Sequence, residues 1–348
     1  MPQYDLRDQT NPDQLRIMLL GPAFHRKTWW AADCASFGFN VIFLDSDGKV
    51  GIISKLPAEV RKRIFTVDVT DEITNAVASL FVTRVLKQEQ FLWNETDKQT
   101  QYIIKTADPK KFYVSVDPSK LTFNDIVVFD SWTADIRSLQ LRYTIDQKID
   151  ISAKSIIDSN FKDYRWTGAM ADKWLADLKK LNCHVIVVCH ETSFEKKEKD
   201  ADGDNKEKLL FSRMQPVSTS NNQGMRMAKE FTDILYFSTV GDQIYIDTRN
   251  DANRDGGSIN LPMEKKKWED MRFKRFLEVL PHLKPSGASQ AAFKFYAPGE
   301  LVVPAVAPVV QVTTPALQLS TAAASNPALI VPAAKQGTTT LAGLFKKQ

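Results

Sequence analysis

The chain has 348 residues, of which 43% are hydrophobic and 25% charged, a composition typical of a folded globular protein and unlike that of disordered or fibrous chains. Its formal net charge of +4 excludes the strong overall basic field by which some nucleic-acid-binding proteins are recognised. Any contact with DNA must therefore come from local basic patches.

The sequence also bears on the compartment. No run of residues reaches the ~18 consecutive apolar residues of a membrane span, and the polar start MPQYDLRDQTNPDQ is unlike a signal peptide. Cys34, Cys183 and Cys189 stand in apolar surroundings, as is typical of buried thiols in a reducing compartment. We therefore expect a cytoplasmic protein.

From residue 16 onward, short apolar runs alternate with helix-length amphipathic runs. This alternation predicts an α/β fold with a mainly parallel central sheet flanked by helices. A helix is expected at 170–182, where the apolar residues recur at helical spacing. The expected strands are 16–20, 40–45, 63–69, 125–131, 184–190, 233–238 and 243–248.

Two segments depart from this alternation. The run 194–208 is densely charged and has little apolar surface to bury, so a mobile loop is expected there. After a core spanning 1–283, the composition shifts to Pro, Ala, Val and Thr, which predicts a flexible linker over 284–336. The last residues, 337–348, form a separate short peptide motif.

The stretch 21–28, GPAFHRKT, has the features of a phosphate-binding loop. A strand precedes it, Gly21 opens the turn, and Lys27 and Thr28 stand where a lysine contacts phosphates and a hydroxyl binds magnesium. Arg26 occupies a position where glycine usually lets the backbone approach the phosphates. Two alternatives remain open: Arg26 acts as an extra cation, or it obstructs the loop. A plain turn with an exposed lysine also fits.

Carboxylates end two of the expected strands. Asp130, followed by Ser131, closes the run IVVFDS, where a carboxylate can hold magnesium opposite Thr28. Asp45 and Asp47 follow the strand 40–45 and can orient or deprotonate an attacking water. A solvated turn is the alternative for this second pair, because Asp-Ser-Asp-Gly is good turn chemistry.

His190 closes the buried strand HVIVVCH. Open α/β sheets bind their ligands at the carboxyl ends of the strands, so this imidazole is a candidate sensor of a terminal phosphate. A structural, hydrogen-bonded histidine fits the same pattern.

Five motifs occur in one order: LLGPxxxxKT, VIFLDSD, IVVFDSWTAD, HVIVVCHE and NNQGMRMAKEFTDILYF. Together they resemble the core of RecA-like P-loop ATPases, and most of all the short phage ATPases of single-strand annealing and recombination. The likeness covers about residues 15 to 260. It implies ATP and Mg²⁺ as cofactors and, for a phage protein, the host cytoplasm as its location.

Carried over position by position, the resemblance makes Lys27 a phosphate contact. It makes Thr28 and Asp130 the magnesium contacts, Asp47 the water-activating acid, and His190 a polar switch where the family usually has glutamine. Arg26 in place of the loop glycine and the shorter Asp47 in place of glutamate both bear on turnover rather than on binding.

The resemblance further implies a homo-oligomer with ATP between subunits, in which a neighbour supplies a cation to the terminal phosphate. Arg249 is the candidate for that cation and Arg254 the second choice. The segments after the strands at 125–131 and 184–190 line the DNA channel in this family and carry basic residues that suit phosphate contacts. These residues are Arg137, Arg142, Lys154, Lys206, Lys208 and Arg213.

The terminal peptide carries an apolar group, Leu341, Leu344 and Phe345, spaced to form one face of a helical turn. It is similar to the short peptides by which replication proteins dock onto sliding clamps; folding back on its own core is the alternative. The function expected from the sequence is single-stranded DNA binding with annealing or recombination. A non-hydrolysing scaffold that recruits replication factors and a helicase-loader ATPase are the alternatives.

Overall fold

The computed structural model describes the chain in seven segments, with part of the predicted DNA-binding and partner-binding residues outside them. The described residues are 14–101, 107–108, 110–148, 161–199, 207–218, 221–250 and 257–300. The residues outside them include Lys154, Lys206, Arg254, Leu341, Leu344 and Phe345. The chain divides after Pro304 into two units, and the description that follows concerns the first.

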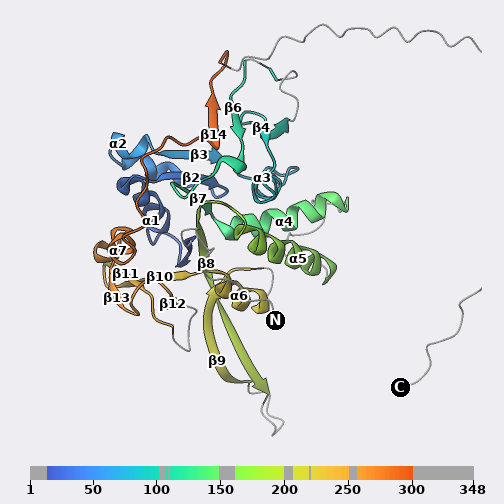
Figure 1. The fold of residues 1–348 in the computed structure, drawn as a ribbon. Coiled ribbons are helices and arrows are strands. Elements are labelled where there is room, and N and C mark those ends of the chain that lie inside the picture. Colours follow the sequence, from blue (N-terminus) through green and yellow to red (C-terminus); the bar gives the residue numbers. More distant parts are fainter. Residues whose placement is uncertain are drawn as a thin grey trace, which may run out of the picture. The chain divides into compact units, whose positions relative to one another are not determined.

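A ten-stranded sheet forms the centre of this unit (Figure 1). Its main path runs β13-β11-β10-β1-β8-β7-β2-β3, and the six strands from β10 to β3 are parallel. The parallel strands are β1 Arg16–Gly21, β2 Asn40–Asp45, β3 Ile64–Asp68, β7 Asp125–Asp130, β8 His184–Lys199 and β10 Asp233–Val240. The antiparallel additions are β9 Glu207–Pro216, β11 Gln243–Asp247, β12 Gly257–Ser258 and β13 Lys265–Lys267. The predicted fold class is confirmed.

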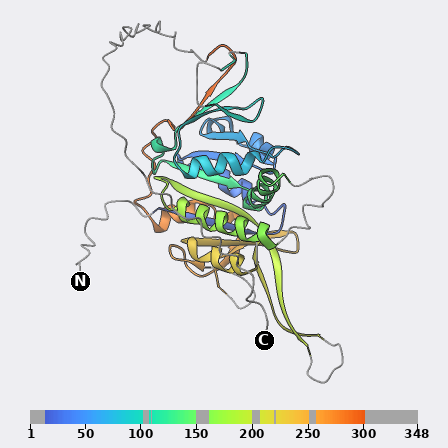
Figure 2. The same ribbon diagram turned by 90° about the vertical axis from the view of Figure 1, so that its right-hand side faces the viewer.

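Helices cover both faces of the sheet, because the strands bury side chains on both sides (Figure 2). On β1, Met18 and Leu20 pack on the face with α3, α4 and α5, while Ile17 and Leu19 pack on the face with α1 and α7. The helices are α1 Lys27–Asp33, α2 Ala58–Arg61, α3 Val77–Leu86, α4 Trp132–Asp146, α5 Phe161–Leu178, α6 Asn221–Met227 and α7 Lys274–Val279. The 3₁₀ turns are η2 Cys34–Phe37, η3 Val50–Lys55, η5 Pro118–Lys120, η6 Ala228–Glu230 and η7 Trp268–Met271.

A second, four-stranded antiparallel sheet was not expected from the sequence. Its order is β14-β6-β4-β5, with β4 Phe91–Asn94, β5 Gln99–Gln101, β6 Tyr113–Val116 and β14 Phe293–Tyr296. Strand β14 lies in the predicted linker, yet Phe293 is buried and pairs with Val116. The folded core therefore continues past residue 283, and residues 284–300 belong to it.

The prediction of a mobile loop at 194–208 is wrong for 194–199 and 207–208, which form strands, and the residues between them lie outside the described ranges. The backbone of β8 continues from the central sheet to Lys199 and pairs with β9 from Glu207 to Pro216, with a bulge between Lys196 and Lys197. This hairpin extends away from the body of the unit as an arm (Figure 1). Strand pairing satisfies the backbone groups whether or not the side chains are apolar, so the charge run did not exclude a strand.

Among the residues that the structure describes, no helix is both long and apolar enough to cross a bilayer.

Candidate functional site

The turn between β1 and α1 begins at a position that only glycine fits. Gly21 has φ +146°, and a Cβ added there would lie 2.4 Å from the backbone oxygen of Phe237 on β10. The close approach of the two strands at this point therefore fixes the start of the loop.

Arg26 takes the backbone conformation for which glycine is usually selected. It immediately precedes α1 with φ 60° and ψ 19°, in the left-handed region, which costs a residue with a side chain about 1 kcal/mol. Its guanidinium carbon lies 5.4 Å from the centre of the Trp268 ring, a cation–π contact at the edge of the site. The loop therefore closes without the glycine, and the Arg26 charge is directed toward Trp268.

Helix α1 is held in place by the segment that contains Trp268. The indole of Trp30 donates a hydrogen bond of 2.7 Å to the Met271 carbonyl. Arg272 binds the buried Asp33 carboxylate with two nitrogens, one of them at 2.9 Å. These contacts fix the helix that carries Lys27 and Thr28 against the C-terminal part of the core.

Lys27 lies at the bottom of the loop, only 4% exposed. Its ammonium donates to the carbonyl oxygens of Gly21 at 2.7 Å and Pro22 at 2.5 Å. Burial lowers the pKa of Lys27 to about 8, although Asp130 and other nearby acidic groups oppose this. Among the described residues, the hydrogen-bond partners of this buried cation are carbonyl oxygens rather than a carboxylate.

Thr28, in α1, contacts Asp130 at the end of β7. The strand that precedes α1, β1, is separated from β7 by β8 in the sheet. The Thr28 hydroxyl donates to Asp130 Oδ2 at 2.6 Å. Burial raises the pKa of Asp130 to about 6, and the hydrogen bond from Thr28 only partly offsets it. A cation beside this carboxylate would favour its ionised form.

The donors at this point suit magnesium that is shared with a nucleotide. A hydroxyl and a carboxylate are hard oxygen ligands, and Mg²⁺ commonly takes one or two protein oxygens with water and phosphate oxygens completing its shell. Within the described ranges, no three His, Cys, Asp or Glu side chains are grouped to hold a metal ion by themselves. Thr28 and Asp130 therefore fit the predicted role only together with phosphates.

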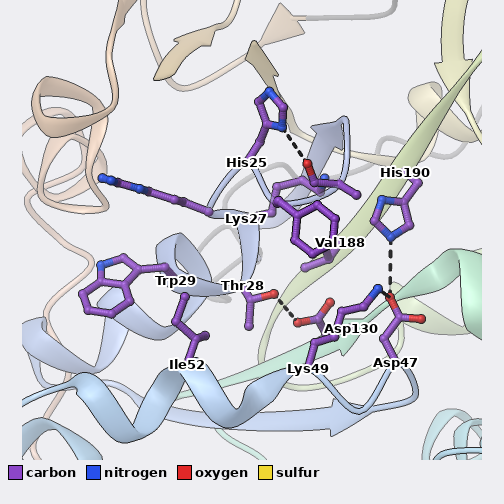
Figure 3. A pocket seen from close by; sticks show the side chains of 13 residues that line it. His25, Lys27, Thr28, Trp29, Asp47, Lys49, Ile52, Asp130, Val188 and His190 are labelled. Atoms are coloured by element: carbon purple, nitrogen blue, oxygen red, sulfur yellow. Dashed lines mark hydrogen bonds and ion pairs between the residues drawn. The ribbon is translucent and has the colours of Figure 1, made fainter. Parts of the chain in front are cut away.

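The two aspartates after β2 have different surroundings. Asp45 is buried and accepts hydrogen bonds from the backbone of Lys49 at 3.2 Å and Val50 at 3.4 Å, so it closes the turn. Asp47 faces the site, where its Oδ2 accepts from Ser131 at 2.9 Å and Lys49 at 3.1 Å (Figure 3).

Nε2 of His190 lies 3.5 Å from the same Asp47 oxygen. Burial alone would raise the pKa of Asp47, but the hydrogen bonds from His190, Ser131 and Lys49 outweigh burial and hold this pKa well below its usual range. A carboxylate of such low basicity is a weak proton acceptor. Asp47 is better placed to hold these three side chains than to take a proton from water.

His190 lies on β8, at the level where the neighbouring strand β1 ends and the loop begins. Its backbone pairs with Gly21, and its N–H donates to the Thr133 hydroxyl at 3.2 Å. The structure brings eight predicted residues together at the carboxyl ends of the parallel strands: Gly21, Arg26, Lys27, Thr28, Asp47, Asp130, Ser131 and His190.

Six of them line a pocket of about 300 Å³, namely Arg26, Lys27, Thr28, Asp47, Asp130 and His190 (Figure 3). The sequence analysis missed part of its lining, namely Ala23, Phe24, His25, Trp29, Lys49, Ile52 and Val188. Lys49 had a sequence signal, since it follows the same Asp-Ser-Asp-Gly turn as Asp47. Ile52 had none, because its position depends on the 3₁₀ turn η3.

Other predicted residues lie elsewhere. Arg249 is not among the described residues that line the pocket; its guanidinium binds Asp247 at 2.8 and 2.9 Å. Arg137 is exposed on α4, whereas Arg142 is half-buried, with Thr83 at 3.5 Å. Lys208 and Arg213 lie on β9 in the arm. Their assignments to a neighbour's site and to DNA remain predictions.

Comparisons with known proteins return little. No model of a protein family matches the chain, and no curated protein matches it. Among solved structures, the chain is similar to one described as the crystal structure of the RadB recombinase, with 16% identity and a TM-score of 0.32. This likeness covers 70% of the chain and 84% of the other protein. The fold class rests on the strand order and pairing described above.

Proposed function

We propose that this protein is a RecA-like, ATP-binding protein that binds single-stranded DNA and promotes annealing or homologous recombination. The observation that carries the proposal is the 2.6 Å contact between Thr28 and Asp130 beside the buried Lys27. A strand, a glycine-opened turn and a helix present this group at the carboxyl edge of a parallel sheet, where such folds bind nucleotides.

Each side of the pocket has a role in this proposal. Lys27 neutralises phosphates at the start of α1, and Thr28 with Asp130 holds the magnesium ion, which neutralises phosphate charge when bound. Trp29 and Ile52 lie on the side of Thr28 away from Asp47 (Figure 3). Their apolar surface suits the base and sugar of the nucleotide.

A nucleotide-binding scaffold that does not hydrolyse ATP is the second candidate. The position of Asp47 favours it, because three side chains converge on the oxygen that would accept the proton of water. Hydrolysis then requires a rearrangement of these contacts or a cation from a neighbouring subunit, for which Arg249 remains the candidate. Binding of ATP is common to both candidates.

DNA binding is proposed for the side of the core that carries α4 and the β8–β9 arm. Arg137 is exposed there, and the arm carries Lys208 and Arg213. The arm is not basic as a whole, since acidic residues slightly outnumber basic ones over 191–216. Contacts with phosphates would therefore come from individual lysines and arginines rather than from a uniform field.

Isothermal titration calorimetry with Mg²⁺ and ATP tests the nucleotide site. The wild type is expected to bind ATP, and Lys27→Ala to lose affinity about 100-fold, because the buried ammonium is the main phosphate contact of the loop. Lys62→Ala, at the exposed lysine that directly follows α2, is the matched control and should bind like the wild type. Circular dichroism and thermal melting establish that both variants fold. If the folded wild type binds no ATP at millimolar concentration, the proposed function is wrong.

A further inference from the structure

A second lysine, which the family resemblance does not assign, faces the nucleotide pocket. Lys49 follows Asp47 on the turn after β2, and its ammonium lies 3.1 Å from Asp47 Oδ2. Its side chain is about half exposed at 51%, whereas that of Asp47 is 16% exposed. The backbone N–H of Lys49 donates to Asp45, which fixes the turn. Lys49 thus has an anchored backbone and an ammonium that reaches the pocket.

The charges of Lys49 and Lys27 act on the same space. Lys49 is among the groups that lower the pKa of Lys27, after the larger effect of burial, so the two ammonium groups repel each other across the site. Lys27 is committed to the carbonyls of Gly21 and Pro22 at the bottom of the loop. An anion between the two lysines would remove the repulsion and gain two charge-assisted hydrogen bonds.

Asp47 keeps Lys49 in this place when no anion is bound. Its Oδ2 holds Lys49, Ser131 and His190 together at one point of the pocket wall. A phosphate group offers more negative charge and more acceptor oxygens than this single carboxylate oxygen. Lys49 can therefore exchange Asp47 for a phosphate with a small movement of a half-exposed side chain.

We propose that Lys49 binds the terminal phosphate of the nucleotide within its own chain, and that this contact distinguishes ATP from ADP. The inference rests on the proposed function and adds a residue and a selectivity to it. It differs from the predicted action of Arg249 because it needs no neighbouring subunit. A monomer of this protein should already prefer the triphosphate.

The test compares the affinities for ADP and for a non-hydrolysable ATP analogue, adenylyl imidodiphosphate, by calorimetry with Mg²⁺ present. In Lys49→Met, the affinity for the analogue should fall about tenfold while that for ADP stays within about twofold, since a charge-assisted hydrogen bond is worth about that factor. Lys49→Arg should retain the preference. Lys55→Met, at an exposed lysine that ends η3 and does not line the pocket, is the matched control and should change neither affinity.

A double variant separates a direct phosphate contact from an indirect effect through Asp47. If Lys49 acts only by neutralising Asp47, then Lys49→Met combined with Asp47→Asn restores the preference for the triphosphate, and the proposal is wrong. If Lys49 touches the phosphate, the double variant keeps the reduced preference. Equal losses for both nucleotides in Lys49→Met, or no loss, would also overturn it. A wild type that binds neither nucleotide would overturn the proposed function as well.

Discussion

Arg26 explains how the loop is built without its usual glycine. The backbone there is left-handed, and the guanidinium packs over Trp268 instead of reaching across Lys27. Residue 26 therefore keeps the left-handed backbone that usually selects glycine, and its side chain contacts another segment. Arg26 also lines the pocket, and both alternatives from the sequence, an extra phosphate cation and an obstruction, remain predictions.

The left-handed backbone leads to a prediction on stability. Arg26→Ala loses the cation–π contact and keeps the strain, whereas Arg26→Gly loses the contact but relieves the strain. Arg26→Gly should therefore be more stable than Arg26→Ala by about 1 kcal/mol in urea denaturation. Equal stability of the two variants would show that residue 26 does not adopt this backbone in solution.

The low pKa of Lys27 predicts that nucleotide binding takes up protons. The group has a pKa of about 8 in the free protein and gains phosphate partners on binding, so its pKa rises in the complex. Proton uptake should be near zero at pH 7 and approach about one proton at pH 9, and ATP affinity should fall as the pH rises above 8. Calorimetry in two buffers of different ionisation enthalpy measures this uptake. Uptake that does not change between pH 7 and 9 would contradict the buried position of Lys27.

The sequence located most of the candidate site because parallel strands align their carboxyl ends. Lys27, Asp130 and His190 each follow or end such a strand, so their convergence could be predicted. The sequence does not show which of Asp45 and Asp47 faces the pocket. Asp45 accepts hydrogen bonds from the backbone of the turn, and the spacing of the two residues does not reveal this. The same holds for the position of the Lys49 ammonium.

Among the elements, α1 is held in position by its contact with the segment 268–276. The Asp33 side chain is 2% exposed, and its carboxylate accepts hydrogen bonds from Nε and Nη2 of Arg272. Together with the bond from Trp30 to Met271, this pair joins the first helix to a segment about 240 residues later. The loop that holds Lys27 is therefore positioned by the end of the core as well as by β1.

Breaking this pair should destabilise the protein. Arg272→Ala leaves the buried Asp33 carboxylate without its counter-charge and should cost about 2–3 kcal/mol in the free energy of unfolding. Asp33→Asn in the Arg272→Ala background should recover much of the loss, because the uncompensated charge is gone. The control is Lys274→Ala, whose exposed pair with Glu278 should contribute less than about 0.5 kcal/mol. Equal effects of the two alanine variants in urea denaturation would contradict the structural role of Arg272.

The elements themselves were predictable to different degrees. Buried strands such as 40–45 and 125–130 are continuous apolar runs and were located within a residue. The four-stranded sheet was missed because its strands are only three or four residues long and one of them, β14, follows the others by more than 170 residues. Such short runs carry little periodicity, and pairing over that distance leaves no local signal.

For the whole molecule, single-stranded DNA binding is expected to depend strongly on salt and weakly on sequence. Charge reversal at Lys206, Lys208 and Arg213 should weaken binding and lower the slope of log affinity against log salt by about 2, as expected when three phosphate contacts are lost. Fluorescence anisotropy at several salt concentrations measures this slope.

The control for this experiment must change the net charge equally at another surface. The control variant reverses Lys55, Lys62 and Lys274. If it lowers the slope as much as the arm variant, the arm does not contact DNA and only the net charge matters. An unchanged slope in the arm variant would likewise remove the arm from the DNA-binding surface.

A crystal structure with Mg²⁺ and adenylyl imidodiphosphate would show whether Lys27, Thr28 and Asp130 form the proposed nucleotide site. We expect phosphates against the Lys27 ammonium and a magnesium ion beside Thr28 and Asp130, with the Arg26 guanidinium still over Trp268. A nucleotide bound elsewhere, or an Arg26 side chain that occupies the phosphate position, would contradict this expectation.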